Sequence, residues 1–248
     1  MSAPKNWFDA NGGAYKAYRP HYPDILAYYL KGLVQHPAHV LDVGCGSGQL
    51  THLLAGRFAT VTGIDPSAEQ IANADDDERI TYLVSGAEDI ALPDDSVDLI
   101  CVAQAAHWFD LPRFYNEVRR IGKADAVLAL ISYGILTLDD ALNARFQDFY
   151  RDEIGPFWPP ERRLVDTGYA DIDFPFKAVA SPEITIRLDW DFRSFLGYLS
   201  TWSAVRHARE KGADAVLTRF ADDLEILWGD PETRRPVSWP IAMRVGRL

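Results

Sequence analysis

The sequence has little cysteine and no long apolar run. Its 248 residues include two cysteines, Cys45 and Cys101, both in apolar, strand-like surroundings. Free thiols are typical of the reducing cytoplasm, so we expect a cytoplasmic protein without disulfides. The longest apolar stretch, AVLALISYGILTL at 126–138, is too short and too interrupted to cross a bilayer. The N-terminal MSAPKNWFDANGG lacks a positive region followed by an apolar stretch, which argues against a signal peptide.

Positive charge is also scarce. The chain has 25 Lys and Arg against 36 Asp and Glu, a formal net charge of −11. Such a surface repels nucleic acid and anionic membranes, and no dense basic stripe offsets it. We therefore expect neither as a partner. Metal-ligand spacing with Cys or carboxylates is missing as well, so we expect no metal site. The six histidines concerned are His21, His36, His39, His52, His107 and His207.

From about residue 24 to 134, strand-like and helix-like segments alternate. The strand-like segments are near-continuous apolar runs, as in a parallel sheet covered on both faces. The helix-like SGQLTHLLAGRF at 47–58 spaces its leucines for one apolar face. This alternation predicts a doubly wound α/β sheet. The strand-like segments are 39–44, 60–65, 80–87, 94–105 and 125–134.

After residue 138 the character changes to aromatic-rich helical segments. We expect helices over 139–158, 191–212 and 214–230, with strands over 183–188 and 239–248. The predicted organisation has three parts. Residues 1–138 form an N-terminal lid and a ligand-binding α/β core, residues 139–230 form a helical cap with one sheet strand, and residues 231–248 form a strand that completes the sheet.

The segment HVLDVGCGSGQL at 39–50 runs from a strand straight into Gly44, Gly46 and Gly48. Glycines at the first strand-to-helix turn let the backbone approach a ligand, and the helix N-terminus offers N–H donors. The spacing is not the G-x-G-x-x-G of dinucleotide sites, because position 49 is Gln, and a P-loop Gly-Lys-Ser/Thr is absent. A tight turn made only for packing remains the alternative.

Two later strand ends carry polar residues. Asp65 ends TGID about twenty residues after the glycines, where a carboxylate can accept both ribose hydroxyls of a nucleoside. Its alternative role is to cap the helix that starts near Pro66. Ala87 and Glu88, in SGAEDIALPDDSVDLI, end the third strand, where a small and a polar residue could edge an adenine.

These three segments together resemble the class I S-adenosylmethionine-dependent methyltransferases over about residues 39–134. The chain departs from that family at IGKADA, where a Lys-Pro-Gly-Gly turn is frequent. The resemblance implies a Rossmann-like fold with a mostly parallel, seven-stranded sheet and S-adenosyl-L-methionine as cofactor. Gly44, Cys45 and Gly46 would line its methionine part. The implied cofactor-binding residues are Tyr18, Arg19, Asp42, Gly44, Cys45, Gly46, Asp65, Pro66, Ala87, Glu88 and Gln104. Asp42 alternatively orders the glycine loop.

The N-terminal AYKAYRPHYPDIL at 14–26 and the later His-Trp-Phe segment are similar to the trans-aconitate methyltransferase-like small-molecule enzymes. In that subgroup the N-terminal segment folds over the cofactor as a lid. His107, which follows the fourth strand, is the best-placed titratable group for a general base. A structural role for His107 remains the alternative. The predicted substrate residues are Tyr22, Trp108, Trp202 and Arg206, although core packing would also explain an aromatic such as Trp202.

The expected function is transfer of a methyl group to a carboxylate or hydroxyl oxygen of a small organic acid, by a monomer or homodimer. A carboxylate is ionised at neutral pH and needs no base, whereas a hydroxyl needs one. Three alternatives stay open. They are a nicotinamide dehydrogenase, which Gln49 disfavours, carbon methylation of a quinone-like or other apolar precursor, and a non-catalytic S-adenosylmethionine-binding protein.

Overall fold

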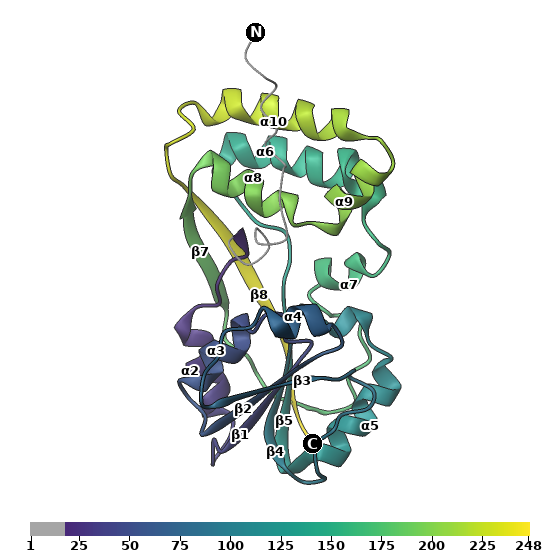
Figure 1. The fold of residues 1–248 in the computed structure, drawn as a ribbon. Helices are drawn as coiled ribbons and strands as arrows, with labels where there is room; N and C mark the ends of the chain where they lie inside the picture. The colour runs from purple at the N-terminus through teal and green to yellow at the C-terminus, as the bar shows by residue number, and fades with distance from the viewer. Residues whose placement is uncertain (1–17) are drawn as a thin grey trace. The chain divides into compact units, whose positions relative to one another are not determined.

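The computed structural model describes residues 18–248, and Figure 1 shows its elements. Most of the predicted N-terminal lid falls on residues 1–17 and lies outside the described residues. By their internal contacts, the described residues form two compact units. One, the sheet unit, consists of His21–Gly134, Arg163–Ile186 and Pro240–Leu248. The other, the helical unit, consists of residues 18–20, Ile135–Arg162 and Arg187–Trp239.

The sheet has the order β3-β2-β1-β4-β5-β8-β6, and β7 also pairs with β8. The strands from β3 to β5 run parallel, whereas β8 is antiparallel to β5 and to the two-residue β6. The doubly wound, mostly parallel sheet is therefore confirmed, with one short strand more than expected. The strands are β1 His39–Val43, β2 Thr60–Asp65, β3 Ile80–Val84, β4 Val97–Ala103, β5 Gly122–Tyr133, β6 Lys177–Ala178, β7 Ile184–Trp190 and β8 Arg235–Arg247.

Helices cover both faces of this sheet. Figure 1 shows α2 and α3 on one side of the strands and α5 on the other. The apolar face of α5 buries Phe114, Val118 and Ile121 against Leu128 and Leu130 of β5 within one core cluster. The turn between β1 and α3 lies at the carboxyl edge of this sheet, whose central strands β1, β4 and β5 are mostly buried. The helices of this unit are α2 Asp24–Gly32, α3 Gln49–Ala55, α4 Ala68–Ala72 and α5 Leu111–Ile121.

The helical unit contains α6 Asp140–Asp148, α8 Phe192–Ser200, α9 Ser203–Glu210 and α10 Asp214–Trp228. A π-helical turn, Phe149–Glu153, and a 3-10 turn, Gly155–Phe157, follow α6. Helix α7, Arg162–Asp166, belongs to the sheet unit from Arg163 on. The single helix expected over 191–212 is wrong, because the chain extends at Trp202. That break buries the Trp202 indole, which is 5% exposed.

The expected cap range 139–230 contains one segment, residues 163–186, that belongs to the sheet unit.

Across residues 18–248, the longest apolar helical stretch falls short of what a bilayer span requires.

Candidate active site

The turn after β1 has the left-handed backbone that its glycines permit. Gly44, Gly46 and Gly48 have φ angles of +70°, +55° and +89°. The Gly44 and Cys45 amides both donate to the Ile64 carbonyl of β2, at 2.8 and 2.9 Å. Gly48 is the N-cap of α3. The loop is thereby fixed to β2 while α3 starts directly behind it.

The three glycines differ in how much space a side chain would have at each position. A Cβ on Gly44 would lie 2.5 Å from the Ala105 Cβ, and one on Gly48 would overlap the Tyr82 hydroxyl. Packing alone therefore requires glycine at these two positions. Among the described residues, a Cβ on Gly46 would meet only the Gln70 amide oxygen, at 3.9 Å. The space beside Gly46 is open, which is what a backbone cradle for a ligand requires.

Asp65 lies at the end of β2 and contacts this loop. One carboxylate oxygen accepts from the Gly46 amide at 2.9 Å, and the other accepts from the Ser67 amide at 2.9 Å. Each oxygen has a further lone pair for a ligand hydroxyl. Pro66 is exposed beside it, and Ser67 caps α4 by accepting from the Gln70 amide. Asp65 thus orders both the loop and the entry to α4.

Asp42 is buried below the loop, with 1% of its surface exposed. Thr51 of α3 donates its hydroxyl to one carboxylate oxygen at 2.7 Å, and the second oxygen is buried without a partner among the described residues. Burial, with a smaller contribution from the charge of Asp65, raises the pKa of Asp42 to about 7. A buried acceptor without a donor is costly, so this oxygen suits a cationic ligand group. Burial also raises the pKa of the Cys45 thiol.

The predicted residues at the next strand ends are also held in place. Ala87 is 5% exposed and belongs to the core cluster, and a Glu88 carboxylate oxygen accepts from the Asp110 amide at 2.9 Å. Gln104 has a φ of +56° and donates its side-chain amide to the Tyr133 carbonyl at 2.8 Å. Backbone strain of this kind in a residue other than glycine clusters at functional sites.

The segment after β4 packs directly on the glycine loop. A Cβ on Gly44 would meet not only Ala105 but also the Phe109 ring, at 3.5 Å. In the sequence, His107 lies between Ala105 and Phe109, and its Nδ1 is 3.0 Å from the Tyr169 hydroxyl. Trp108 is 58% exposed, and its ring centroid is 4.7 Å from that of His107. The structure therefore packs the two ends of the segment 105–109, which contains His107 and Trp108, against the predicted cofactor loop.

The other predicted substrate and lid residues each make contacts within their own unit. Tyr22 of the sheet unit packs edge-on against Tyr133, with ring centroids 6.0 Å apart. The remaining four residues belong to the helical unit, so their proximity to the glycine loop stays a prediction. They are Tyr18, Arg19, Trp202 and Arg206. Within that unit, Arg206 is exposed, with its side chain 69% accessible, and lies 3.9 Å from Glu210.

Within the helical unit, Trp202 lies in an aromatic core. Its ring centroid is 5.1 Å from that of Trp158 and 5.7 Å from those of Tyr150 and Tyr198. The Arg19 guanidinium lies 5.9 Å from the Tyr198 ring centroid. These contacts give Trp202 a packing role of its own.

Sequence reasoning missed two aromatic residues at the site. Tyr82 of β3 is in register with Gly63 of β2, which is in register with Asp42. A Cβ on Gly63 would lie 2.8 Å from the Tyr82 ring, so the missing side chain lets that ring lie across β2 toward the glycine loop. A glycine inside a strand signals such a close approach. Tyr169, the partner of His107, is 62 residues away in sequence and gave no signal.

Acid–base and hydrogen-bonding groups, rather than metal ligands, characterise the site. In the part of the chain that the structure describes, no three His, Cys, Asp or Glu side chains converge as a metal site would need. The loop offers bare backbone, with the Asp42 and Asp65 carboxylates at the ends of the two adjoining strands. This arrangement suits a cationic nucleoside ligand whose reactive group is presented to a second molecule.

Known proteins match this chain closely. A family model described as a methyltransferase domain matches residues 41–130. A methyltransferase of Dictyostelium discoideum is 36% identical over 221 residues, which cover 88% of this chain and 84% of that protein. An S-adenosylmethionine-dependent methyltransferase of Saccharomyces cerevisiae is 27% identical over 172 residues, 62% of this chain and 58% of that protein.

A solved structure, of a type II methyltransferase from Anaeromyxobacter dehalogenans, shares 43% identity with a TM-score of 0.86. The match covers 93% of this chain and 98% of that one. Fold, glycine loop and relatives agree. The chain belongs to the class I S-adenosylmethionine-dependent methyltransferases, and S-adenosyl-L-methionine is its cofactor.

Proposed function

We propose that this enzyme methylates an oxygen atom, carboxylate or hydroxyl, of a small organic acid. The observation that supports the proposal is the packing of Ala105 and Phe109 on the glycine loop, because His107 lies between these two residues in the sequence. The imidazole is a hydrogen-bonding group suited to an oxygen acceptor, and the buried Tyr169 hydroxyl holds its Nδ1.

The chain's own residues fit the cofactor. We propose that Asp65 accepts from the ribose hydroxyls, that Asp42 faces the cationic amino-acid part, and that the open side of Gly46 receives it. Ala87 and Glu88 would flank the adenine. Bound S-adenosylmethionine supplies a methyl group already activated by its sulfonium. The protein must then mainly align the acceptor and exclude water.

The proposed role of His107 differs between a carboxylate acceptor and a hydroxyl acceptor. A carboxylate is already ionised at pH 7, so His107 would only donate a hydrogen bond that orients it. A hydroxyl keeps its proton at pH 7, so His107 would remove it, and the hydrogen bond between Nδ1 and Tyr169 would orient the ring. We favour the carboxylate, because an ionised acceptor places no demand on a base.

The net charge of −11 supports a small molecule rather than nucleic acid as the acceptor. We also propose a cytoplasmic location, on the two free cysteines. Membership of the trans-aconitate methyltransferase-like subgroup is likewise a proposal, which rests on the N-terminal tyrosines and the His-Trp-Phe segment.

Transfer of labelled methyl from S-adenosylmethionine to a panel of dicarboxylic acids, hydroxy acids, phenols and a quinol tests the proposal. Alkali releases labelled methanol from methyl esters but not from ethers or carbon-methylated products. Alkali-labile product from the carboxylic acids is the expected result. Stable label on carbon would assign the alternative carbon methylation, and no transfer to any acceptor by a protein that binds the cofactor would indicate a non-catalytic role.

The pH profile of kcat/KM for the acceptor, measured with S-adenosylmethionine saturating so that cofactor binding and Asp42 do not contribute, separates the two oxygen acceptors. A carboxylate acceptor predicts a flat profile from about pH 6 upward, because no base must lose a proton. A hydroxyl acceptor with His107 as base predicts a rate that falls below the pKa of the imidazole. The His107→Asn variant, which keeps a hydrogen-bond donor, should retain more activity than His107→Ala in the first case only.

A further inference from the structure

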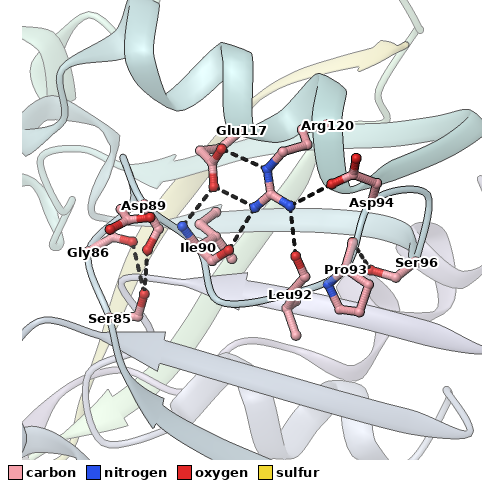
Figure 2. Close-up of polar contacts among 10 residues, drawn as sticks. All are labelled: Ser85, Gly86, Asp89, Ile90, Leu92, Pro93, Asp94, Ser96, Glu117 and Arg120. Atoms are coloured by element: carbon pink, nitrogen blue, oxygen red, sulfur yellow. Dashed lines mark hydrogen bonds and ion pairs between the residues drawn. The ribbon is translucent and has the colours of Figure 1, made fainter.

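The loop between β3 and β4, residues 85–96, carries the predicted adenine residues but contains no helix or strand. A segment of this kind must satisfy its backbone polar groups outside regular structure. Figure 2 shows that side chains of α5 reach across to it. Within the loop, Ser85 donates to the Asp89 carbonyl at 2.9 Å and Ser96 to the Pro93 carbonyl at 2.6 Å.

Arg120 of α5 makes most of the contacts from outside the loop. Its guanidinium donates to the Ile90 carbonyl at 2.7 Å, to the Leu92 carbonyl at 2.8 Å and to an Asp94 carboxylate oxygen at 2.9 Å. Figure 2 shows the guanidinium between these acceptors and Glu117. Charge-assisted hydrogen bonds from one planar group to several acceptors fix geometry as well as adding energy.

Glu117, one turn before Arg120 on α5, completes the arrangement. It accepts from Arg120 at 2.9 and 2.7 Å and from the Ile90 amide at 2.7 Å. Hydrogen bonds from Arg120 lower the pKa of Glu117, so it is ionised at neutral pH. Side chains of α5 thus satisfy both the amide and the carbonyl of Ile90. They replace the backbone hydrogen bonds that a neighbouring strand would supply. The Ile90 side chain is 2% exposed and anchored in the core.

The same helix holds the other end of the loop. Asp110, the N-cap of α5, donates its amide to Glu88 at 2.9 Å. Of the two residues predicted to flank the adenine, Glu88 is therefore held directly at the N-cap of α5, and the next attachment is at Ile90, two residues later. Without the attachment at Ile90, the Glu88 contact and the burial of Ala87 alone would hold this part of the loop, so we expect both residues to be less firmly placed.

We propose that Arg120 and Glu117 are a positioning pair that holds the 85–96 loop in its cofactor-binding conformation and thereby sets the affinity for the adenosine half of the cofactor. The proposal rests on the proposed adenine role of Ala87 and Glu88, and it is independent of which acceptor the enzyme methylates. Neither residue of the pair is assigned a contact with the cofactor.

Calorimetric titration of Arg120→Gln with S-adenosylhomocysteine and with adenosine tests this proposal without any acceptor. Arg113→Gln is the matched control, because Arg113 is an exposed arginine on the same helix whose side chain makes no hydrogen bond to the described residues. We expect Arg120→Gln to weaken both ligands by the same factor, about tenfold, while Arg113→Gln binds like the wild type. Arg120→Lys should fall between them, since an ammonium donates fewer hydrogen bonds.

Hydrogen exchange of residues 85–96 provides a second readout in case Arg120→Gln folds poorly, and Glu117→Gln is the milder variant for it. Faster exchange confined to this loop, with melting temperature close to the wild type and weaker ligand binding, supports the positioning role. Wild-type affinity for both ligands in a variant with a mobile loop would overturn it. Loss of S-adenosylhomocysteine affinity with unchanged adenosine affinity would also overturn it, because the effect would then lie at the methionine half.

Discussion

The open space beside Gly46 gives the sharpest prediction about the cofactor loop. Gly46→Ala places a methyl group where only the Gln70 amide oxygen lies within 4 Å, so the folded protein has room for it. The φ of +55° remains unfavourable for alanine and should lower the free energy of unfolding by about 1–2 kcal/mol. If the space is the cofactor cradle, the same methyl group must also collide with the ligand.

The magnitude follows from overpacking. An extra methyl group in a close-packed site costs about 1–3 kcal/mol, which corresponds to roughly a tenfold to hundredfold loss of affinity for S-adenosylmethionine. Gly212→Ala is the matched control, because Gly212 also has a positive φ, +70°, and open space around it, but lies in the turn between α9 and α10. Gly44→Ala should instead lose about 2–5 kcal/mol of stability, since its Cβ would clash with Ala105.

Chemical denaturation gives the unfolding free energy, and calorimetry gives the dissociation constant. We expect Gly46→Ala and Gly212→Ala to lose similar stability while only Gly46→Ala loses cofactor affinity. Equal affinity in the two variants would refute the assignment of the cradle, whatever their stability.

Three further predictions concern other parts of the molecule. The pKa of Asp42 is about 7 in the folded protein and near 4 in the unfolded chain, so the free energy of unfolding of the ligand-free protein should fall by about 4 kcal/mol as the pH rises from 4 to 7. Asp42→Asn should remove this fall in denaturation experiments across that pH range, and an unchanged pH dependence would contradict the burial argument. His107→Ala should bind the cofactor normally in calorimetry but turn over more slowly, and equal turnover would make His107 structural. Gly197→Ala should lower the melting temperature, since its Cβ would lie 2.6 Å from the Tyr18 ring, and Tyr18→Ala should restore it; a melting temperature unchanged by Gly197→Ala alone would contradict the contact.

The sequence was informative where function follows from local pattern. The strand before Gly44, the acid at Asp65 and the alternation of strands and helices were all readable, because hydrophobic period and glycine placement are local signals. The structure adds that Asp65 already accepts from the Gly46 and Ser67 amides. Helix capping, the alternative considered for Asp65, is therefore compatible with ligand binding, because each oxygen keeps a lone pair.

Features that depend on distant segments were not predictable. The partner of His107 is Tyr169, which arrives from a segment expected in the cap. The left-handed backbone at Gln104 arises from tertiary packing, since the sequence offers no glycine there. The helix expected over 191–212 is interrupted at Trp202, whose indole is buried in the aromatic core. The free energy gained by that burial comes from residues distant in the sequence, so local helix propensity did not predict the break.

The central claim is that the glycine loop binds S-adenosylmethionine, and calorimetric titration of the wild-type protein tests it most directly. The account predicts micromolar binding of S-adenosylmethionine and S-adenosylhomocysteine, with no heat on titration with NAD. Binding of NAD in their place, or no binding of either cofactor form, would contradict it.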